Sequence, residues 1–193
     1  GALDANYFQT LAYLEEFNEN NGTHLVSAAE IHVEPMGAYS YKYKSIDDIA
    51  EGATVAVPND PSNEARALNV LVSAGLIKVK EGDLITVADI IENPKNLQFT
   101  ELEAAQLPRA LDDIDIAVIN GNYALDADLD VTKDAIFVED ENSQEMIARR
   151  NVLAVKEGNE KSEKIKDLIE VLTSDDVRTF IEEQYKGAVV PVF

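Results

Sequence analysis

The sequence predicts an α/β protein with mostly parallel sheets, because short strand-like runs alternate with helix-like segments along the chain. Residues 53–58 hold an apolar run of the kind found in strands buried on both faces of a parallel sheet, and the expected strand at 113–119 starts with Asp/Ile alternation and becomes apolar. The chain has 193 residues without an internal repeat or a low-complexity segment. This length suits one domain or two small lobes of a single binding unit.

The composition excludes several classes of protein. The net charge of −21 repels nucleic acid, and an acidic surface of this kind favours a soluble monomer. With no cysteine, the chain has no disulfide, no thiolate zinc site and no cysteine nucleophile. No apolar run approaches the roughly 18–20 residues that a membrane-spanning helix requires.

The elements are expected in a regular order. A helix over about residues 7–20, with Asn6 as its N-cap, ends at Asn21–Gly22. One or two strands follow, in which Ile31 and Val33 alternate with polar residues. The remaining elements are a short helix near 45–50, a strand at 53–58, a helix from 61 to about 75, an extended piece at 76–82, a short helix before 94, a strand and short helix within 97–111, a strand at 113–119, a strand at 149–158, and helices at 160–172 and 175–185.

The start of the helix after residue 60 carries the first candidate site. Asp60 can cap this helix, and Pro61 suits its first position. Asn63 and Arg66 share one helix face at a strand's carboxyl end, where α/β proteins bind ligands. A guanidinium beside a helix N-terminus suits a carboxylate. The simpler alternative is that Arg66 pairs with Glu64 or another acid.

Two further groups of residues are weaker candidates. Asn120 and Asn122 of "NGN" follow a second apolar strand, and their amides can accept from an ammonium or donate to a carboxylate. Simple turn formation is the favoured explanation of an Asn-Gly pair on the local sequence alone. Tyr7 and Phe8 suit an apolar ligand pocket, although such aromatic residues more often belong to a core.

Signals for catalysis and for cofactors are weak. The chain lacks the GxSxG, HExxH and GxGxxG motifs, and we expect no catalytic set, no metal site and no cofactor. His32 and Glu34 share a strand face, but two histidines without cysteine make a poor zinc site.

Several stretches together identify a known family. The chain resembles the methionine-binding (NlpA/MetQ-type) lipoproteins over nearly its whole length, through "DANYFQ", "HVEPMGAYS", "GATVAVPNDPSNEARAL", "ENPKNL", "ELEAAQLPRALDDIDIAVINGNYAL" and "FVED". The resemblance implies a two-lobed periplasmic-binding-protein-like fold that captures methionine or a related amino acid between lobes that close around it. It also implies a lipid-anchored, extracytoplasmic protein that delivers its ligand to an ABC permease and ATPase.

The resemblance also assigns roles to individual residues. It implies that Arg66 and Asn63 contact the ligand, together with Asn120 or Asn122. It implies that Phe8, and less strongly Tyr7, cover the ligand's side chain. The family usually has a histidine of the ligand site where this chain has Thr10, so another amino acid or a methionine-containing dipeptide is the first alternative ligand.

The resemblance further predicts how the chain divides. We expect lobe one over residues 1–37 and 146–193, without the N-terminal strands that the family has before "DANYFQ", and lobe two over 38–145. A small-molecule-processing enzyme on the same fold is the alternative from another class, because a fold does not dictate a function.

Overall fold

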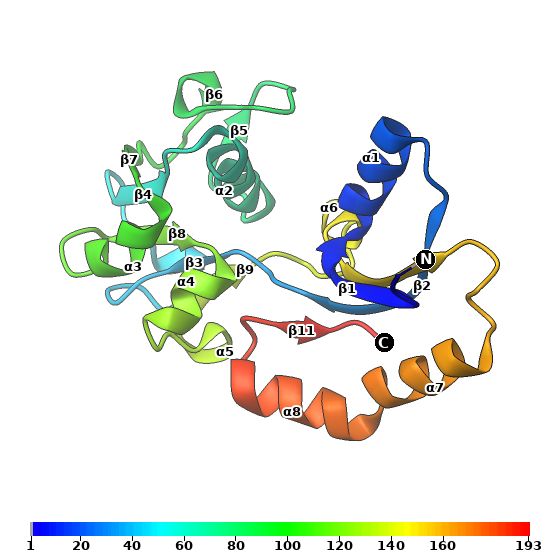
Figure 1. Ribbon diagram of the computed structural model, residues 1–193. Coiled ribbons are helices and arrows are strands. Elements are labelled where there is room, and N and C mark those ends of the chain that lie inside the picture. The colour runs from blue at the N-terminus through cyan, green and yellow to red at the C-terminus, as the bar shows by residue number, and fades with distance from the viewer. Residues whose placement is uncertain (1) are drawn as a thin grey trace. The chain divides into compact units, whose positions relative to one another are not determined.

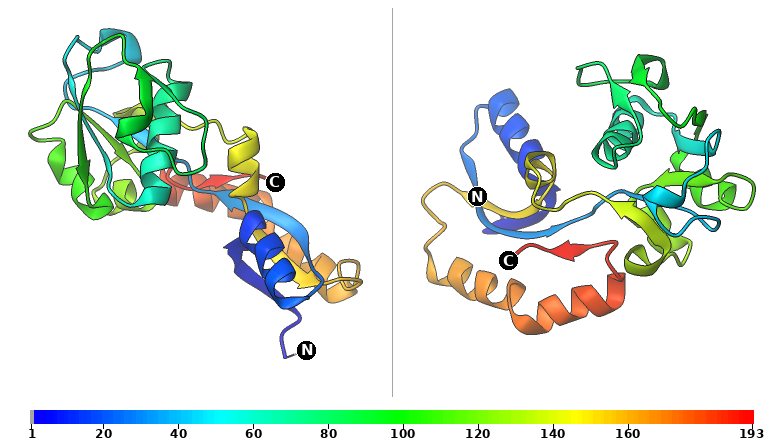
Figure 2. Two further views of the ribbon diagram at one scale, coloured as in Figure 1. Left: turned by 90° about the horizontal axis from the view of Figure 1, so that it is seen from above. Right: turned by 180° about the vertical axis from the view of Figure 1, so that it is seen from behind.

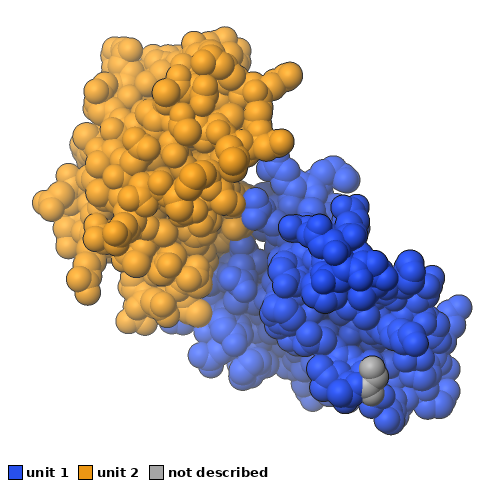
Figure 3. Space-filling model, turned by 45° about the horizontal axis from the view of Figure 1, so that its top comes forward, with its two compact units in different colours: residues 1–34, 140–193 blue, residues 35–139 orange. Residues whose placement is uncertain are grey.

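The computed structural model describes residues 2–193, which form two compact units. Unit 1 consists of the residues up to Glu34 together with Asp140–Phe193, and unit 2 is Pro35–Glu139 (Figure 3). The chain therefore passes from one unit to the other twice, after Glu34 and after Glu139. The boundaries expected from the sequence lie after residues 37 and 145.

Unit 2 contains a five-stranded mixed sheet with the strand order β7-β4-β8-β3-β9 (Figure 1). Its strands are β3 (Gly37–Tyr39), β4 (Thr54–Pro58), β7 (Gln98–Leu102), β8 (Ile116–Ile119) and β9 (Ala135–Val138). The parallel pairing expected from the sequence is present where β4 pairs with β7 and with β8. Strand β3 runs antiparallel to both β8 and β9, so the sheet as a whole is mixed.

Helix α2 (Pro61–Ser73) packs its apolar face against the sheet of unit 2. Leu68 and Leu71 of the helix and Val55 and Val57 of β4 are fully buried in one hydrophobic cluster. The other elements of this unit are η1 (Ile46–Asp48), β5 (Lys78–Val79), η2 (Val87–Asp89), β6 (Ile90–Glu92), η3 (Ala104–Gln106), α3 (Leu107–Ala110), α4 (Gly121–Asp126) and α5 (Val131–Asp134). The short helix expected before residue 94 is thus only the 3-10 turn η2, which leads directly into β6.

The start of α2 confirms the expected helix signal. Asp60 is the N-cap, and its carboxylate accepts a hydrogen bond from the backbone N–H of Asn63. Pro61 occupies the first turn, where its missing N–H costs no hydrogen bond. After the helix, Gly75 adopts a φ of 74°, a conformation that glycine accepts without strain.

Unit 1 contains an antiparallel sheet with the strand order β1-β10-β2-β11. Its strands are β1 (Ala5–Thr10), β2 (Leu25–Val33), β10 (Asn151–Lys156) and β11 (Val190–Pro191). Helices α1 (Leu11–Asn21) and α6 (Gln144–Ala148) lie on one side of this sheet, and α7 (Glu163–Leu172) and α8 (Asp175–Tyr185) on the other (Figure 2). Leu14 of α1 is buried against Val152 and Ala154 of β10.

The N-terminal segment corrects the sequence analysis. Residues 7–10 are not the first turn of a helix but part of β1, which pairs with β10 through Tyr7 and Leu153 among others. Thr10, and not Asn6, is the N-cap of α1. The buried side chain of Gln9 donates to the carbonyl of Val152 at 2.7 Å, which ties this segment further to β10. Long-range pairing thus overrides a local helical pattern, as is common for segments with aromatic residues. The helix ends as expected, because Gly22 has a φ of 61°.

Candidate functional site

The candidate site in unit 2 begins with a hydrogen-bond network at the N-terminus of α2. The amide Nδ2 of Asn63 donates to both carboxylate oxygens of Asp60, at 3.0 Å and 3.1 Å. The backbone N–H of Asn63 donates to the same carboxylate at 3.1 Å. Asp60 therefore caps the helix and also fixes the side chain of Asn63.

Asn120 brings the carboxyl end of β8 into this network. It directly follows the strand and stands at the N-cap position of α4. Its Nδ2 donates to Oδ1 of Asn63 at 2.7 Å. The Oδ1 atom of Asn120 is buried and accepts no hydrogen bond from any of residues 2–193. A buried acceptor without a donor costs on the order of 1–3 kcal/mol, so this atom favours a ligand group that donates.

Arg66 lies one turn further along the same face of α2 and forms an ion pair with Glu139. Its Nε donates to Oε1 of Glu139 at 2.8 Å and its Nη2 donates to Oε2 at 2.6 Å. Both side chains are only 12% exposed. Oε2 of Glu139 also accepts from the backbone N–H of Met36 at 2.6 Å. A two-pronged contact of this kind holds the guanidinium in one orientation.

The ion pair settles which acid lies next to Arg66. The sequence suggested Glu64 or another acid as the partner of Arg66, and the partner is Glu139, which follows β9. Glu64 instead points its Oε1 at the backbone N–H of Val87, at 2.9 Å. Burial raises the pKa of Glu64, and the nearby carboxylates of Glu101 and Asp89 act in the same direction. Glu139 is the residue that sequence reasoning missed, because 73 positions separate it from Arg66.

The structure separates the two asparagines of the "NGN" turn. Asn120 contacts Asn63, whereas Asn122 lies on α4 and is exposed to solvent. Among the predicted residues of unit 2, the structure therefore brings together Asn63 and Asn120 with the neighbouring Arg66, and it leaves Asn122 outside this network.

Tyr7, one of the three predicted site residues in unit 1, contacts His32. Its hydroxyl is hydrogen-bonded to Nδ1 of His32, and the two rings meet edge to face with centroids 5.6 Å apart. Nε2 of His32 lies 3.4 Å from Oε1 of Glu34. Burial raises the pKa of Tyr7 to about 12, with Glu34 contributing, so the phenol is neutral at physiological pH. Tyr7 thus has a structural partner across the sheet.

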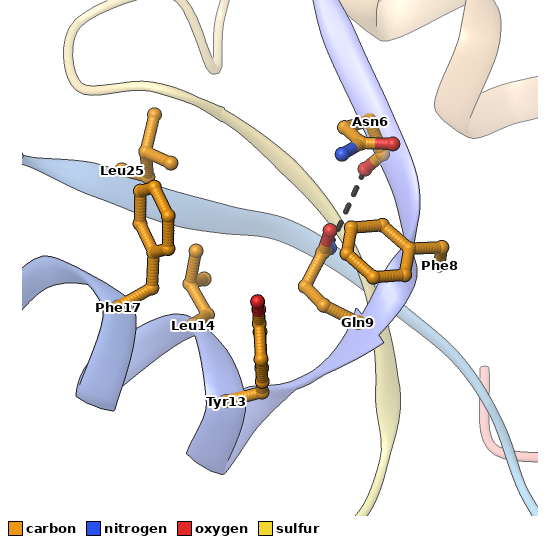
Figure 4. A pocket seen from close by; sticks show the side chains of 7 residues that line it. All are labelled: Asn6, Phe8, Gln9, Tyr13, Leu14, Phe17 and Leu25. Carbon is orange, nitrogen blue, oxygen red and sulfur yellow. Dashed lines mark hydrogen bonds between the residues drawn. The ribbon is translucent and has the colours of Figure 1, made fainter.

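Phe8 and Thr10 have different surroundings. Phe8 is 65% exposed and meets the ring of Tyr13 edge to face, with centroids 5.9 Å apart. A small cavity of about 90 Å³ lies beside these rings (Figure 4), and it is lined by Asn6, Phe8, Gln9, Tyr13, Leu14, Phe17 and Leu25. The hydroxyl of Thr10 accepts from the backbone N–H of Tyr13 at 3.2 Å, which is its role as N-cap.

The chemistry available in unit 2 is that of recognition. A guanidinium held by Glu139 and an acceptor on Asn120 lie near the N-terminus of one helix, and together they complement a molecule that carries an anion and a cation. Within residues 2–193, no group of three or more histidine, aspartate or glutamate residues is arranged to hold a metal ion. None of the helices that the structure describes has the length and apolarity to cross a membrane.

Comparison with known proteins gives a consistent result. The NlpA lipoprotein family model matches residues 1–193. The D-methionine-binding lipoprotein MetQ of Escherichia coli K12 is 43% identical over 194 residues, which cover 98% of this chain and 70% of MetQ.

Solved structures agree with this result over the whole chain. A nutrient-binding protein from Burkholderia cenocepacia, bound to methionine, is 46% identical with a TM-score of 0.72, and the match covers 100% of this chain and 80% of that one. A periplasmic substrate-binding protein of an ABC transporter from Coxiella burnetii is 42% identical with a TM-score of 0.71, with the same coverage. These matches confirm the predicted α/β fold of the periplasmic-binding-protein type. The chain belongs to the NlpA lipoprotein family.

Proposed function

We propose that this protein is an extracytoplasmic, lipid-anchored substrate-binding protein that captures methionine and delivers it to an ABC importer. The methionine-binding names of its relatives support this function, as does the methionine bound in the Burkholderia cenocepacia structure. The permease and ATPase are the partners that such a role requires, and a monomer is the form in which we expect the protein to act.

One observation in unit 2 carries the proposal. The buried Oδ1 of Asn120 has no hydrogen-bond partner within residues 2–193 and therefore favours a donor from the ligand. Asn120 is hydrogen-bonded to Asn63 of α2. Arg66 lies on the same face of this helix and supplies a cation. The ammonium and carboxylate of a free amino acid match these two groups. We assign the ammonium to Asn120, which Asn63 supports, and the carboxylate to Arg66. We favour Asn120 over the exposed Asn122 for this role.

Three residues of unit 1 complete the proposal. Phe8 exposes most of its ring and is available to pack on an apolar side chain, and Tyr7 is its weaker companion. Thr10 already serves as a helix cap, and it is shorter than the histidine that the family usually has there. For this reason another amino acid or a methionine-containing dipeptide stays the alternative ligand.

We infer that the protein binds its ligand without transforming it. The family consists of substrate-binding proteins, and the polar groups around Asn120 and Arg66 supply hydrogen bonds and charge but no evident acid–base pair or nucleophile. An enzyme on the same fold is the alternative from another class. Mass spectrometry of methionine incubated with the purified protein tests that alternative. Detection of a converted product would favour it.

The function is tested by native mass spectrometry of the purified protein and by calorimetric titration. The titrants are L-methionine, D-methionine and methionine-containing dipeptides. We expect saturable heat with at least one stereoisomer of methionine, with one ligand bound per chain. Absence of both a bound species and heat with all of these ligands would rule out the methionine proposal.

The site is tested by the substitution Arg66→Ala. Removing one partner of a desolvated charge pair typically costs about 2–5 kcal/mol of binding free energy, so methionine affinity should fall at least about thirtyfold. Arg109→Ala is the matched control, because Arg109 is an exposed arginine of the same unit. Equal affinity of the two variants would show that Arg66 does not hold the ligand.

A further inference from the structure

We propose that Asp60 sets the hydrogen-bond polarity of the site and thereby selects ligands that carry an ammonium. This inference rests on the proposed function, because it explains how the site tells one end of an amino acid from the other. Asp60 itself is a positioning residue, and its influence passes through Asn63 and Asn120.

The first step is the orientation of the Asn63 amide. A carboxylate offers only acceptors, so the group of Asn63 that faces Asp60 must be its donor, Nδ2. The two contacts from Nδ2 of Asn63 to the Asp60 carboxylate oxygens, at 3.0 Å and 3.1 Å, agree with this assignment. The carbonyl oxygen Oδ1 of Asn63 must then face away from Asp60.

The second step is the orientation of the Asn120 amide. Because Asn63 presents Oδ1, which can only accept, Asn120 must answer with Nδ2, and these atoms are 2.7 Å apart. This leaves Oδ1 of Asn120 as the end of the chain of bonds. That atom is buried and has no partner within residues 2–193, so the network ends in an unsatisfied acceptor.

The third step concerns the ligand. An unsatisfied acceptor in a buried position favours an N–H donor and disfavours a carboxylate oxygen, since two acceptors repel. Arg66, which follows Asn63 by one helical turn, has only N–H donors and a positive charge, so it favours a carboxylate and disfavours an ammonium. The two preferences together fix the direction in which an amino acid lies, with its ammonium at Asn120 and its carboxylate at Arg66.

The substitution Asp60→Asn tests this polarity with little risk to the fold. Asparagine caps helices about as well as aspartate, so α2 keeps its N-cap. The new amide can donate to Oδ1 of Asn63, which lets the amides of Asn63 and Asn120 both reverse and present a donor to the ligand. Asp130→Asn is the matched control, because Asp130 is also a largely buried N-cap in unit 2, at the start of α5.

The measurement is the ratio of the affinities for L-methionine and for 4-(methylthio)butanoate, which is methionine without its amino group. Calorimetric titration of the wild-type protein should give a strong preference for methionine. In Asp60→Asn we expect this preference to fall at least about tenfold, through weaker methionine binding, while the affinity for 4-(methylthio)butanoate stays the same or rises. Asp130→Asn should keep the wild-type ratio.

The possible failures are distinguishable. A wild-type protein that binds neither compound overturns the proposed function and this inference with it. A wild-type protein that binds methionine, together with an Asp60→Asn variant that keeps the ratio or loses affinity for both compounds equally, overturns this inference alone. If Asp60 acts through Asn63 and Asn120, Asp60→Asn should no longer change the affinity ratio in a protein that also carries Asn120→Ala. An undiminished change of the ratio in that double variant would also contradict this inference.

Discussion

Arg66 lies where the first turns of α2 already carry a partial positive charge, and Glu139 is the residue that offsets this arrangement. The carboxylate of Glu139 accepts hydrogen bonds from two nitrogens of the Arg66 guanidinium and from the backbone N–H of Met36. Glu139 therefore joins α2 to the first residues of unit 2. The sequence allowed Arg66 to be selected from its helix position. It could not reveal Glu139, whose proximity depends on how β9 joins the sheet.

The ion pair leads to a prediction about stability. Glu139→Ala removes the two-pronged carboxylate contact of Arg66 in a mostly buried position and should lower the free energy of unfolding by about 3–5 kcal/mol. The double variant Arg66→Ala/Glu139→Ala should lose clearly less than the sum of the two single losses. Urea denaturation of all four proteins measures this coupling, and strictly additive losses would contradict it.

At the scale of elements, the junction of β1 and α1 shows how a short segment acquires its structure. Tyr7, Phe8 and Thr10 fit a helical pattern locally, yet pairing with β10 makes this segment a strand. The helix begins only at Leu11, and the hydroxyl of Thr10 accepts a hydrogen bond from the backbone N–H of Tyr13. By contrast, α2 was predicted correctly, because Asp60 and Pro61 are strong local signals that agree with the packing.

The cap at Thr10 predicts the result of two substitutions. Thr10→Ala should destabilise the protein by about 1 kcal/mol, whereas Thr10→Ser keeps an accepting hydroxyl and should cost much less. Thermal unfolding of the three proteins gives the comparison. If Thr10 also belongs to the ligand site, as the family resemblance implies, Thr10→Ala should weaken methionine binding as well, and unchanged binding would restrict Thr10 to its role as a cap.

Within α2, Glu64 predicts a dependence of stability on pH. Burial raises the pKa of Glu64 above its ordinary value of 4.5, so the folded protein binds this proton more tightly than the unfolded chain does. The stability that this proton confers is present below pH 4.5 and is lost as the pH rises through the higher pKa of the folded state.

The substitution Glu64→Gln removes this charge and keeps an oxygen for the N–H of Val87. Relative to the wild type, the variant should therefore become more stable as the pH rises from 4 to 7. Unfolding midpoints measured across this range test the trend, with Glu163→Gln as control because that side chain is 88% exposed. A stability difference that does not change with pH would contradict the expected burial effect.

At the scale of the whole molecule, the α/β class and most helices followed from apolar periodicity and helix caps. Strand direction did not follow, because it depends on contacts between segments far apart in the sequence. Parallel pairing holds for β4, β7 and β8, whereas β3 joins the same sheet antiparallel, and the sheet of unit 1 is antiparallel throughout. Likewise, the motifs selected Asn63 and Arg66 and left the choice between Asn120 and Asn122 open. Only the structure reveals the hydrogen bonds of Asn63 to Asp60 and Asn120.

We propose that unit 2 recognises both charged ends of a free amino acid. The decisive test is titration of the wild-type protein with L-methionine and with methioninamide, in which the carboxylate is replaced by a neutral amide. This comparison changes only the ligand, so it cannot be confused with a folding defect. We expect the amide to bind at least about thirtyfold more weakly, because it lacks the carboxylate that Arg66 pairs with in the bound amino acid. Equal affinities for the two compounds would contradict it.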